Sequence, residues 1–238
     1  MRRQGQAADR PAGREGQVLA RPAARTARPE ATTPQAGQYR LGLGGRRDGL
    51  LYVPVSCRLD RPAPFALMLH GAGGSASHGL ALLRPLADAA GLVLLSVDSR
   101  GRTWDVLLDD FGPDVQFIND ALEHAFERCS IDPSRVAIGG FSDGASYALS
   151  LGIGNGELFT HVIAFSPGFM ASPHREGTPR IYISHGTRDR VLAIDPCSRR
   201  IVPRLQRTGY DVLYREFDGP HTIPPEISAE AVNWFLGG

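Results

Sequence analysis

A serine between two glycines lies where a strand-like run gives way to a helix-like one. The stretch 140–144 reads GFSDG, a G-x-S-x-G pattern with Ser142 at its centre. A serine on such a tight turn can act as a nucleophile, and glycines two residues before and after it remove side chains that would collide with the strand and helix. An ordinary Gly-rich turn is the alternative. The apolar run 135–139 before the motif and the small residues 143–152 after it favour the nucleophile.

A second glycine-rich segment, HGAGG at 70–74, ends another apolar run. A loop of this kind can turn backbone N–H groups toward a reacting oxygen, and we expect those of Ala72 and Asp143 to form an oxyanion hole. Gly73 is a candidate pocket residue. The alternative, a phosphate-binding loop, requires a following Lys-Ser or Lys-Thr, and the chain contains no Lys. His70 is expected to bond the loop backbone rather than to act as a base.

The nucleophile needs a base, and four histidines follow it. In chains with this kind of turn, the acid and then the histidine come after the serine. His221 lies in a Gly-Pro loop after the last strand-like run, and it is our candidate base. His161 begins a strand, His174 lies in a polar loop, and His185 is expected to have a structural role.

The candidate acid is Asp189, in the loop just beyond the strand-like run 180–186. Ligands and catalytic groups gather at the carboxyl ends of strands in open α/β sheets. Asp195 is the main rival and could instead cap the helix that follows it. Asp218 is a weaker rival because it is close to His221 in the chain.

These residues must be positioned by alternating strands and helices. Several strand-like runs are continuously apolar, as strands covered on both faces require. The alternation predicts a three-layer α/β/α sandwich with a mostly parallel sheet and no large lid domain. The expected strands are 49–57, 64–71, 91–99, 135–142, 161–168, 180–186 and 211–217. Helices are expected around 115–129, 143–152, 196–208 and 224–236, and one that starts or kinks near Pro85.

The length of 238 residues and apolar content of 42% fit one well-cored domain. Residues 1–40 hold eight Arg and three acidic residues, a balance of +5, which leaves −4 for residues 41–238. Residues 1–38 lack periodic apolar residues, so we expect a disordered tail followed by a single domain over 39–238.

Several classes of function are not indicated. The mildly acidic domain does not suggest a nucleic-acid surface, and no apolar run is long enough for a membrane span. The tail has no apolar core of a secretory signal, which favours a cytoplasmic location. Cys57, Cys129 and Cys197 are widely spaced and suggest neither a metal site nor a disulfide framework.

The segments HGAGG, GFSDG, HGTRD and DGPH, in this order, resemble α/β-hydrolases, and more narrowly the phospholipase/carboxylesterase and polyhydroxybutyrate-depolymerase-like esterases. The resemblance covers roughly 49–237. It implies a Ser142–Asp189–His221 triad, an oxyanion hole at Ala72 and Asp143, no cofactor and no metal. The implied activity is the hydrolysis of a small-molecule carboxylic ester or thioester through an acyl-enzyme; the oligomeric state is not indicated.

Two positions depart from the family pattern. Ala145 stands where many relatives have a second glycine, and the charged Asp143 follows the nucleophile. An acid at this position keeps open a non-catalytic, hydrolase-like binding protein, and a peptidase or acyltransferase on the same fold is a further alternative. Trp104, in the loop after the run 91–99, is a candidate pocket wall, with a surface loop anchored by one aromatic as the equal alternative.

Overall fold

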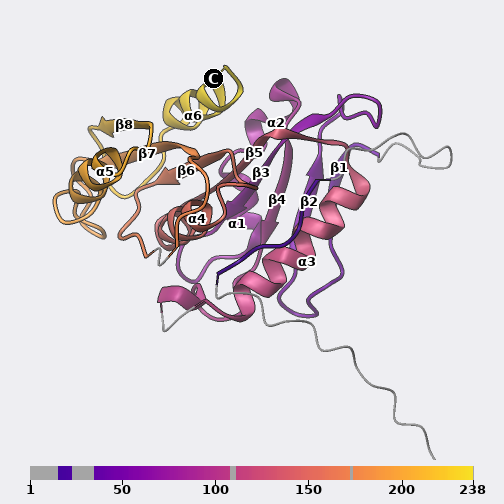
Figure 1. The fold of residues 1–238 in the computed structure, drawn as a ribbon, viewed down its shortest axis with the longest axis horizontal. Coiled ribbons are helices and arrows are strands. Elements are labelled where there is room, and N and C mark those ends of the chain that lie inside the picture. Colours follow the sequence, from indigo (N-terminus) through magenta and orange to yellow (C-terminus); the bar gives the residue numbers. More distant parts are fainter. Residues whose placement is uncertain (1–15, 23–34, 108–110, 172–173, 238) are drawn as a thin grey trace, which may run out of the picture.

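The computed structural model describes residues 16–22, 35–107, 111–171 and 174–237, and in these residues eight strands form one sheet (Figure 1). The strand order is β1-β2-β4-β3-β5-β6-β7-β8. Strands β3 to β8 are parallel to one another, whereas β2 pairs antiparallel with β4 and β1 pairs antiparallel with β2 at one edge. The bounds are β1 Gly37–Arg40, β2 Gly49–Val53, β3 Ala63–Leu69, β4 Val93–Val97, β5 Ile131–Phe141, β6 His161–Phe165, β7 Arg180–Gly186 and β8 Val212–Phe217.

Helices cover both faces of the sheet, as the sequence predicts. Helices α3 (Pro113–Arg128), α4 (Asp143–Gly154) and α5 (Ser198–Arg207) contribute to the apolar core on one face. Helices α1 (Ala76–Ala81), α2 (Arg84–Ala90) and α6 (Pro225–Gly237) contribute to the core on the other. Pro85 lies in the first turn of α2, where its missing N–H costs no helical bond. The predicted three-layer sandwich is therefore confirmed.

No separate lid covers the sheet edge within the described residues. Residues 166–179 connect β6 to β7, and the described part of this connection contains no helix or strand. None of the described helices is long and apolar enough to cross a membrane.

Residues 16–22 belong to the segment expected to be a disordered tail, but they pack against the domain. Residues 16–22, here called the N-terminal strap, lie against α3 and α4, and Val18 has no exposed surface. The amide oxygen of Asn155 accepts the N–H of Val18 at 2.7 Å, and that of Asn119 accepts the N–H groups of Leu19 and Ala20 at 2.8 Å. Two buried asparagines thus satisfy the strap's backbone, which apolar periodicity alone does not indicate. Residues 1–15 and 23–34 lie outside the described residues. Strand β1 begins at Gly37, two residues before the expected start of the domain at residue 39.

His161 is a buried histidine of the core, and its surroundings predict that stability depends on pH. Its ring packs edge-on against Trp234 and Phe235 at 5.2 and 5.0 Å. Burial, assisted by the charge of Arg180, lowers the pKa of His161 to about 4. In the unfolded chain a histidine has a pKa of about 6.5, so between these values only the unfolded state binds the proton.

Stability should therefore fall as the pH is lowered from about 6.5 towards 4. We expect His161→Phe, which keeps the aromatic packing, to make this fall shallower by up to about 1.4 kcal/mol per pH unit. Urea unfolding of the wild-type protein and the variant, from pH 8 down to the lowest pH at which both are folded, measures how the free energy of unfolding changes with pH. The difference in this free energy at pH 8 is the baseline. Parallel curves would show that His161 does not carry this dependence.

Candidate active site

Ser142 lies on a strained turn between β5 and α4. Its backbone has φ 58° and ψ −121°, a left-handed conformation that side chains rarely adopt. The flanking glycines are sterically required: a Cβ on Gly140 would lie 2.5 Å from the carbonyl carbon of Gly144. A Cβ on Gly144 would lie 2.3 Å from the carbonyl oxygen of Leu69 in β3. The strand–turn–helix setting expected for a nucleophile is therefore present around Ser142.

Asp189 and His221 meet at the carboxyl edge of the same sheet. Asp189 follows β7, His221 follows β8, and the His221 Nδ1 lies 2.5 Å from Asp189 Oδ2. The other carboxylate oxygen of Asp189 accepts the N–H groups of Val191 and Leu192 at 2.8 and 2.9 Å. Burial raises the pKa of Asp189, but the hydrogen bonds from His221, Leu192 and Val191 outweigh it and leave the pKa below its usual value. The carboxylate is therefore ionised near neutral pH and orients the imidazole.

His221 also lies beside the turn that carries Ser142. The ring of Phe141, the residue before the serine, packs on the His221 ring at a centroid distance of 4.5 Å. Within the described residues, no hydrogen bond joins the Ser142 hydroxyl to His221. In many hydrolases this contact forms or tightens only when substrate binds. The structure thus brings the candidate acid and the candidate base together and places His221 next to the serine turn.

The rival residues lie in other surroundings. Asp195 and Asp218 pair with Arg199 and Arg188 at 2.8 Å, and their side chains are 77% and 81% exposed. His161 is in the core, as described above.

His185 is a second histidine that contacts Asp189. Its Nε2 lies 2.7 Å from the carbonyl oxygen of Leu192 and 3.3 Å from Asp189 Oδ2, so it carries a proton. Its Nδ1 accepts the hydroxyl of Ser198 at 2.7 Å. Burial lowers the pKa of His185, which keeps the ring neutral. These contacts agree with the structural role expected for His185: its ring holds Asp189 and the loop that carries Asp189 in place.

The HGAGG loop packs directly on the serine turn. A Cβ on Gly71 would lie 3.4 Å from the Cβ of Ser142. His70 Nδ1 donates to the carbonyl of Gly71 at 2.7 Å, and its Nε2 accepts the N–H of Ser99 at 3.0 Å. Burial lowers the pKa of His70, so this imidazole is a neutral brace for the loop backbone, as predicted.

Trp104 requires a correction, because its side chain has no exposed surface and so cannot form a pocket wall. Its Nε1 donates to the carbonyl of His70 at 2.9 Å, and its ring stacks on Tyr147 at 5.1 Å. Trp104 therefore supports the HGAGG loop from beneath. Gly73 in that loop is exposed and has a φ of 67°, which glycine adopts without strain.

The two candidate oxyanion donors have backbone N–H groups available. Asp143 is the first residue of α4, where a helical N–H has no acceptor within the helix. Across the described ranges, no acceptor bonds the N–H of Ala72. The Asp143 carboxylate accepts the hydroxyl of Thr103 at 2.6 Å. Thr103, which the sequence analysis did not single out, therefore fixes the side chain of Asp143 next to Ser142.

A mostly parallel sheet with a serine turn after β5 and an Asp–His pair beyond β7 and β8 defines the α/β-hydrolase fold. Comparison with known sequences narrows the assignment: the phospholipase/carboxylesterase family matches residues 109–232, and the chain belongs to this family.

Known relatives agree with this assignment. A putative esterase, NocK from Nocardia uniformis subsp. tsuyamanensis, is 31% identical over 134 residues, which are 53% of this chain and 39% of that protein. The match therefore spans about two fifths of that relative's length.

Solved structures share the fold. The crystal structure of esterase PE8 superposes with a TM-score of 0.65 at 19% identity, over 79% of this chain and 97% of that one. The carboxylesterase of Bacillus cereus gives 0.61 at 17% identity, over 81% and 94%. Esterase 2 of Thermogutta terrifontis phosphorylated by paraoxon gives 0.62 at 18% identity, over 84% and 91%.

Proposed function

We propose that this protein is a serine hydrolase that cleaves carboxylic esters, including thioesters, through an acyl-enzyme on Ser142. The observation that carries the proposal is the Asp189–His221 hydrogen bond beside the strained turn of Ser142. The membership of an esterase family supports it.

In the proposed mechanism, Nε2 of His221 takes the proton of Ser142 while the serine oxygen attacks the carbonyl carbon of the ester. Asp189 holds the proton on Nδ1 of His221, which leaves Nε2 as the base, and stabilises the imidazolium that forms. His221 then gives the proton to the departing alcohol. Water attacks the acyl-enzyme with His221 again as base, which releases the carboxylic acid and restores Ser142.

The backbone N–H groups of Ala72 and Asp143 are the proposed donors to the oxyanion. The positive end of α4 faces the same region, which favours negative charge there. The negative side chain of Asp143 opposes this effect. Its hydrogen bond to Thr103 spreads part of that charge onto a neutral donor, which supports an active site despite the acidic residue.

The expected substrates are short or soluble esters. The connection between β6 and β7 is short, so a substrate reaches the edge of the sheet without displacing a separate lid domain in the described part of the chain. The acid and base rest on short loops after β7 and β8, which limits their movement when substrate binds.

Covalent labelling tests the proposal. A fluorophosphonate probe should add once to the purified protein, and peptide mass spectrometry should find the adduct on Ser142. Hydrolysis of p-nitrophenyl esters from acetyl to decanoyl should then be fastest for the short acyl groups. A protein that neither reacts with the probe nor cleaves any ester would contradict the proposal and favour a hydrolase-like binding protein. Cleavage of peptide amides in preference to esters would instead identify a peptidase.

A further inference from the structure

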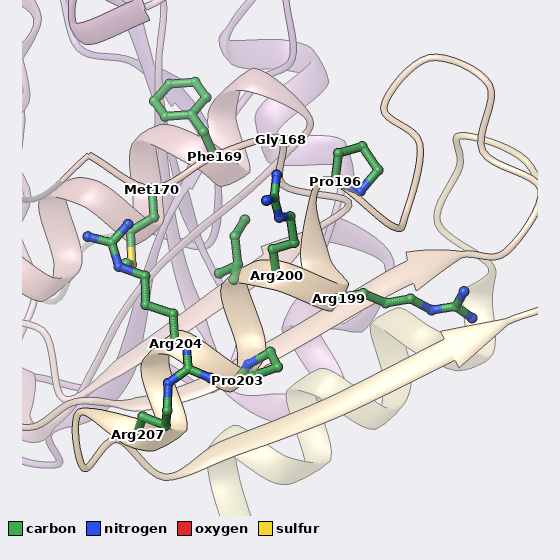
Figure 2. Close-up of a pocket in the computed structure, with 10 residues that line it drawn as sticks. Gly168, Phe169, Met170, Pro196, Arg199, Arg200, Pro203, Arg204 and Arg207 are labelled. Atoms are coloured by element: carbon green, nitrogen blue, oxygen red, sulfur yellow. The ribbon is translucent and has the colours of Figure 1, made fainter.

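A groove of about 570 Å³ lies between residues 168–170 and helix α5 (Figure 2). Four arginines of α5 line it: Arg199, Arg200, Arg204 and Arg207. We propose that this arginine groove binds a carboxylate or phosphate group of the ester substrate, so that the enzyme prefers negatively charged esters. This inference rests on the proposed esterase function and specifies its substrate class.

Most of the positive charge of the groove is uncompensated. Its lining contains no acidic residue, and within the described residues the guanidinium groups of Arg200, Arg204 and Arg207 have no hydrogen-bonding or ion-pair partner. Arg199 on the same helix is different: it pairs with Asp195 at 2.8 Å and with Glu216 at 2.6 Å. Figure 2 shows Arg199 extending toward the neighbouring strand, whereas Arg200 and Arg204 extend toward residues 168–170. Three of the four lining arginines, Arg200, Arg204 and Arg207, therefore lack a counter-charge within the described residues.

The stability of α5 does not account for this arrangement. Arg204 and Arg207 lie near the helix carboxyl end, where a positive charge is favourable, but Arg200 lies in the first turn, where it is not. The spacing of Arg200, Arg204 and Arg207 is i, i+4 and i+7, which places three like charges on one helix face. A bound anion would offset this repulsion and would interact with the guanidinium groups by charge-assisted hydrogen bonds.

The groove adjoins the candidate active site through two bonded links. The N–H of Gly168 donates to Ser146 Oγ at 2.9 Å, and Ser146 lies one turn after Ser142 in α4. Gly168 also packs on Leu192, since a Cβ on Gly168 would lie 3.2 Å from the Leu192 side chain. The N–H of Leu192 donates to the carboxylate of Asp189. Gly168 and Leu192 therefore lie between the groove and the candidate active site, and an ester that bridges them would have its carbonyl at Ser142 and its anionic end in the groove.

The rest of the lining suits a short apolar linker. Phe169 and Met170 are half-buried and lie between Gly168 and the arginines. A cavity of this size holds a small molecule. The ligand that fits is an ester whose reactive carbonyl and anionic end are separated by a few methylene groups or one ring.

Two matched pairs of substrates test the inference. On the acyl side, the p-nitrophenyl monoester of adipic acid is compared with p-nitrophenyl hexanoate, which has the same number of acyl carbons and no charge. On the alcohol side, 4-acetoxybenzoate is compared with its neutral methyl ester. The measured quantity is the ratio of kcat/KM for the charged ester to that for the neutral one.

For the wild-type protein we expect a ratio above one in at least one pair, falling as salt is added. The double variant Arg200→Gln/Arg204→Gln should lower that ratio at least about tenfold, mainly through KM, which is the effect of losing a charge-assisted hydrogen bond. Arg199→Gln is the control, because it removes a lining charge that Asp195 and Glu216 already neutralise, and it should leave the ratio within about twofold.

A ratio that shows no preference in either pair, or a preference that survives the double substitution, overturns the inference while esterase activity stands. If the wild-type protein hydrolyses neither the neutral nor the charged esters, the proposed function itself fails and takes the groove's substrate role with it. Inorganic phosphate distinguishes a general anion site: competition with the charged ester alone supports the groove, and equal inhibition of both esters contradicts it.

Discussion

Replacing Ser142 with alanine should lower kcat/KM for p-nitrophenyl esters by up to about a millionfold, because the groups of a catalytic triad act as a unit. The residual rate would come from the oxyanion donors and substrate binding alone. Loss of the hydroxyl should also abolish labelling by a fluorophosphonate. Initial rates with a short ester, and intact mass after labelling, measure the two effects.

The control for this prediction is Ser96→Ala. Ser96 is a buried serine of β4 whose hydroxyl has no hydrogen-bond partner in the described residues, so the same deletion there removes no bond. We expect this variant to keep its activity within about threefold, since no group near the reacting atoms changes. A Ser142→Ala protein that is folded and retains a tenth or more of the activity would refute the assignment of the nucleophile.

The second large effect is expected for Asp189→Asn. An asparagine amide keeps the size of the side chain but can present an N–H to His221 Nδ1, which would favour the tautomer with its proton on Nε2. That tautomer cannot accept the proton of Ser142, and the corresponding change in a well-studied triad lowers turnover about ten-thousandfold. We expect a loss of this order in kcat at neutral pH. Steady-state kinetics together with fluorophosphonate labelling rates measure it.

Asp195→Asn is the matched control, because Asp195 lies in the same connection between β7 and α5 but pairs with Arg199 at the surface. Its activity should stay within about twofold of wild type. If Asp195→Asn caused the greater loss, the acid would have been assigned to the wrong residue of this loop.

The sequence predicts the central strands and the site loops because their signals are local. β4 and β6 are apolar except for Ser96 and His161, and burial on both faces explains that pattern directly. β1 gives no such signal, since it is a short, polar strand at the sheet edge, largely exposed. Its formation depends on antiparallel pairing with β2, a contact that no periodicity within residues 37–40 indicates.

The features of the site that the sequence does not predict depend on contacts between side chains that are far apart in the sequence. The order of Ser142, Asp189 and His221 along the chain is informative because the topology fixes which strand ends are adjacent. The position of Trp104 beneath the HGAGG loop depends on Tyr147 and on the carbonyl of His70, which belong to other elements. The same holds for Thr103 with Asp143: neither residue alone indicates that a hydroxyl and a carboxylate will meet.

The N-terminal strap has a consequence for the order in which the chain acquires its structure. Its residues leave the ribosome before those of α3 and α4, yet Val18 bonds to Asn155, 137 residues later in the chain. Closing so long a loop is entropically costly, and the receiving groups exist only once α3 and α4 are in place. The strap therefore docks late, and until then the surface that receives it is open to solvent.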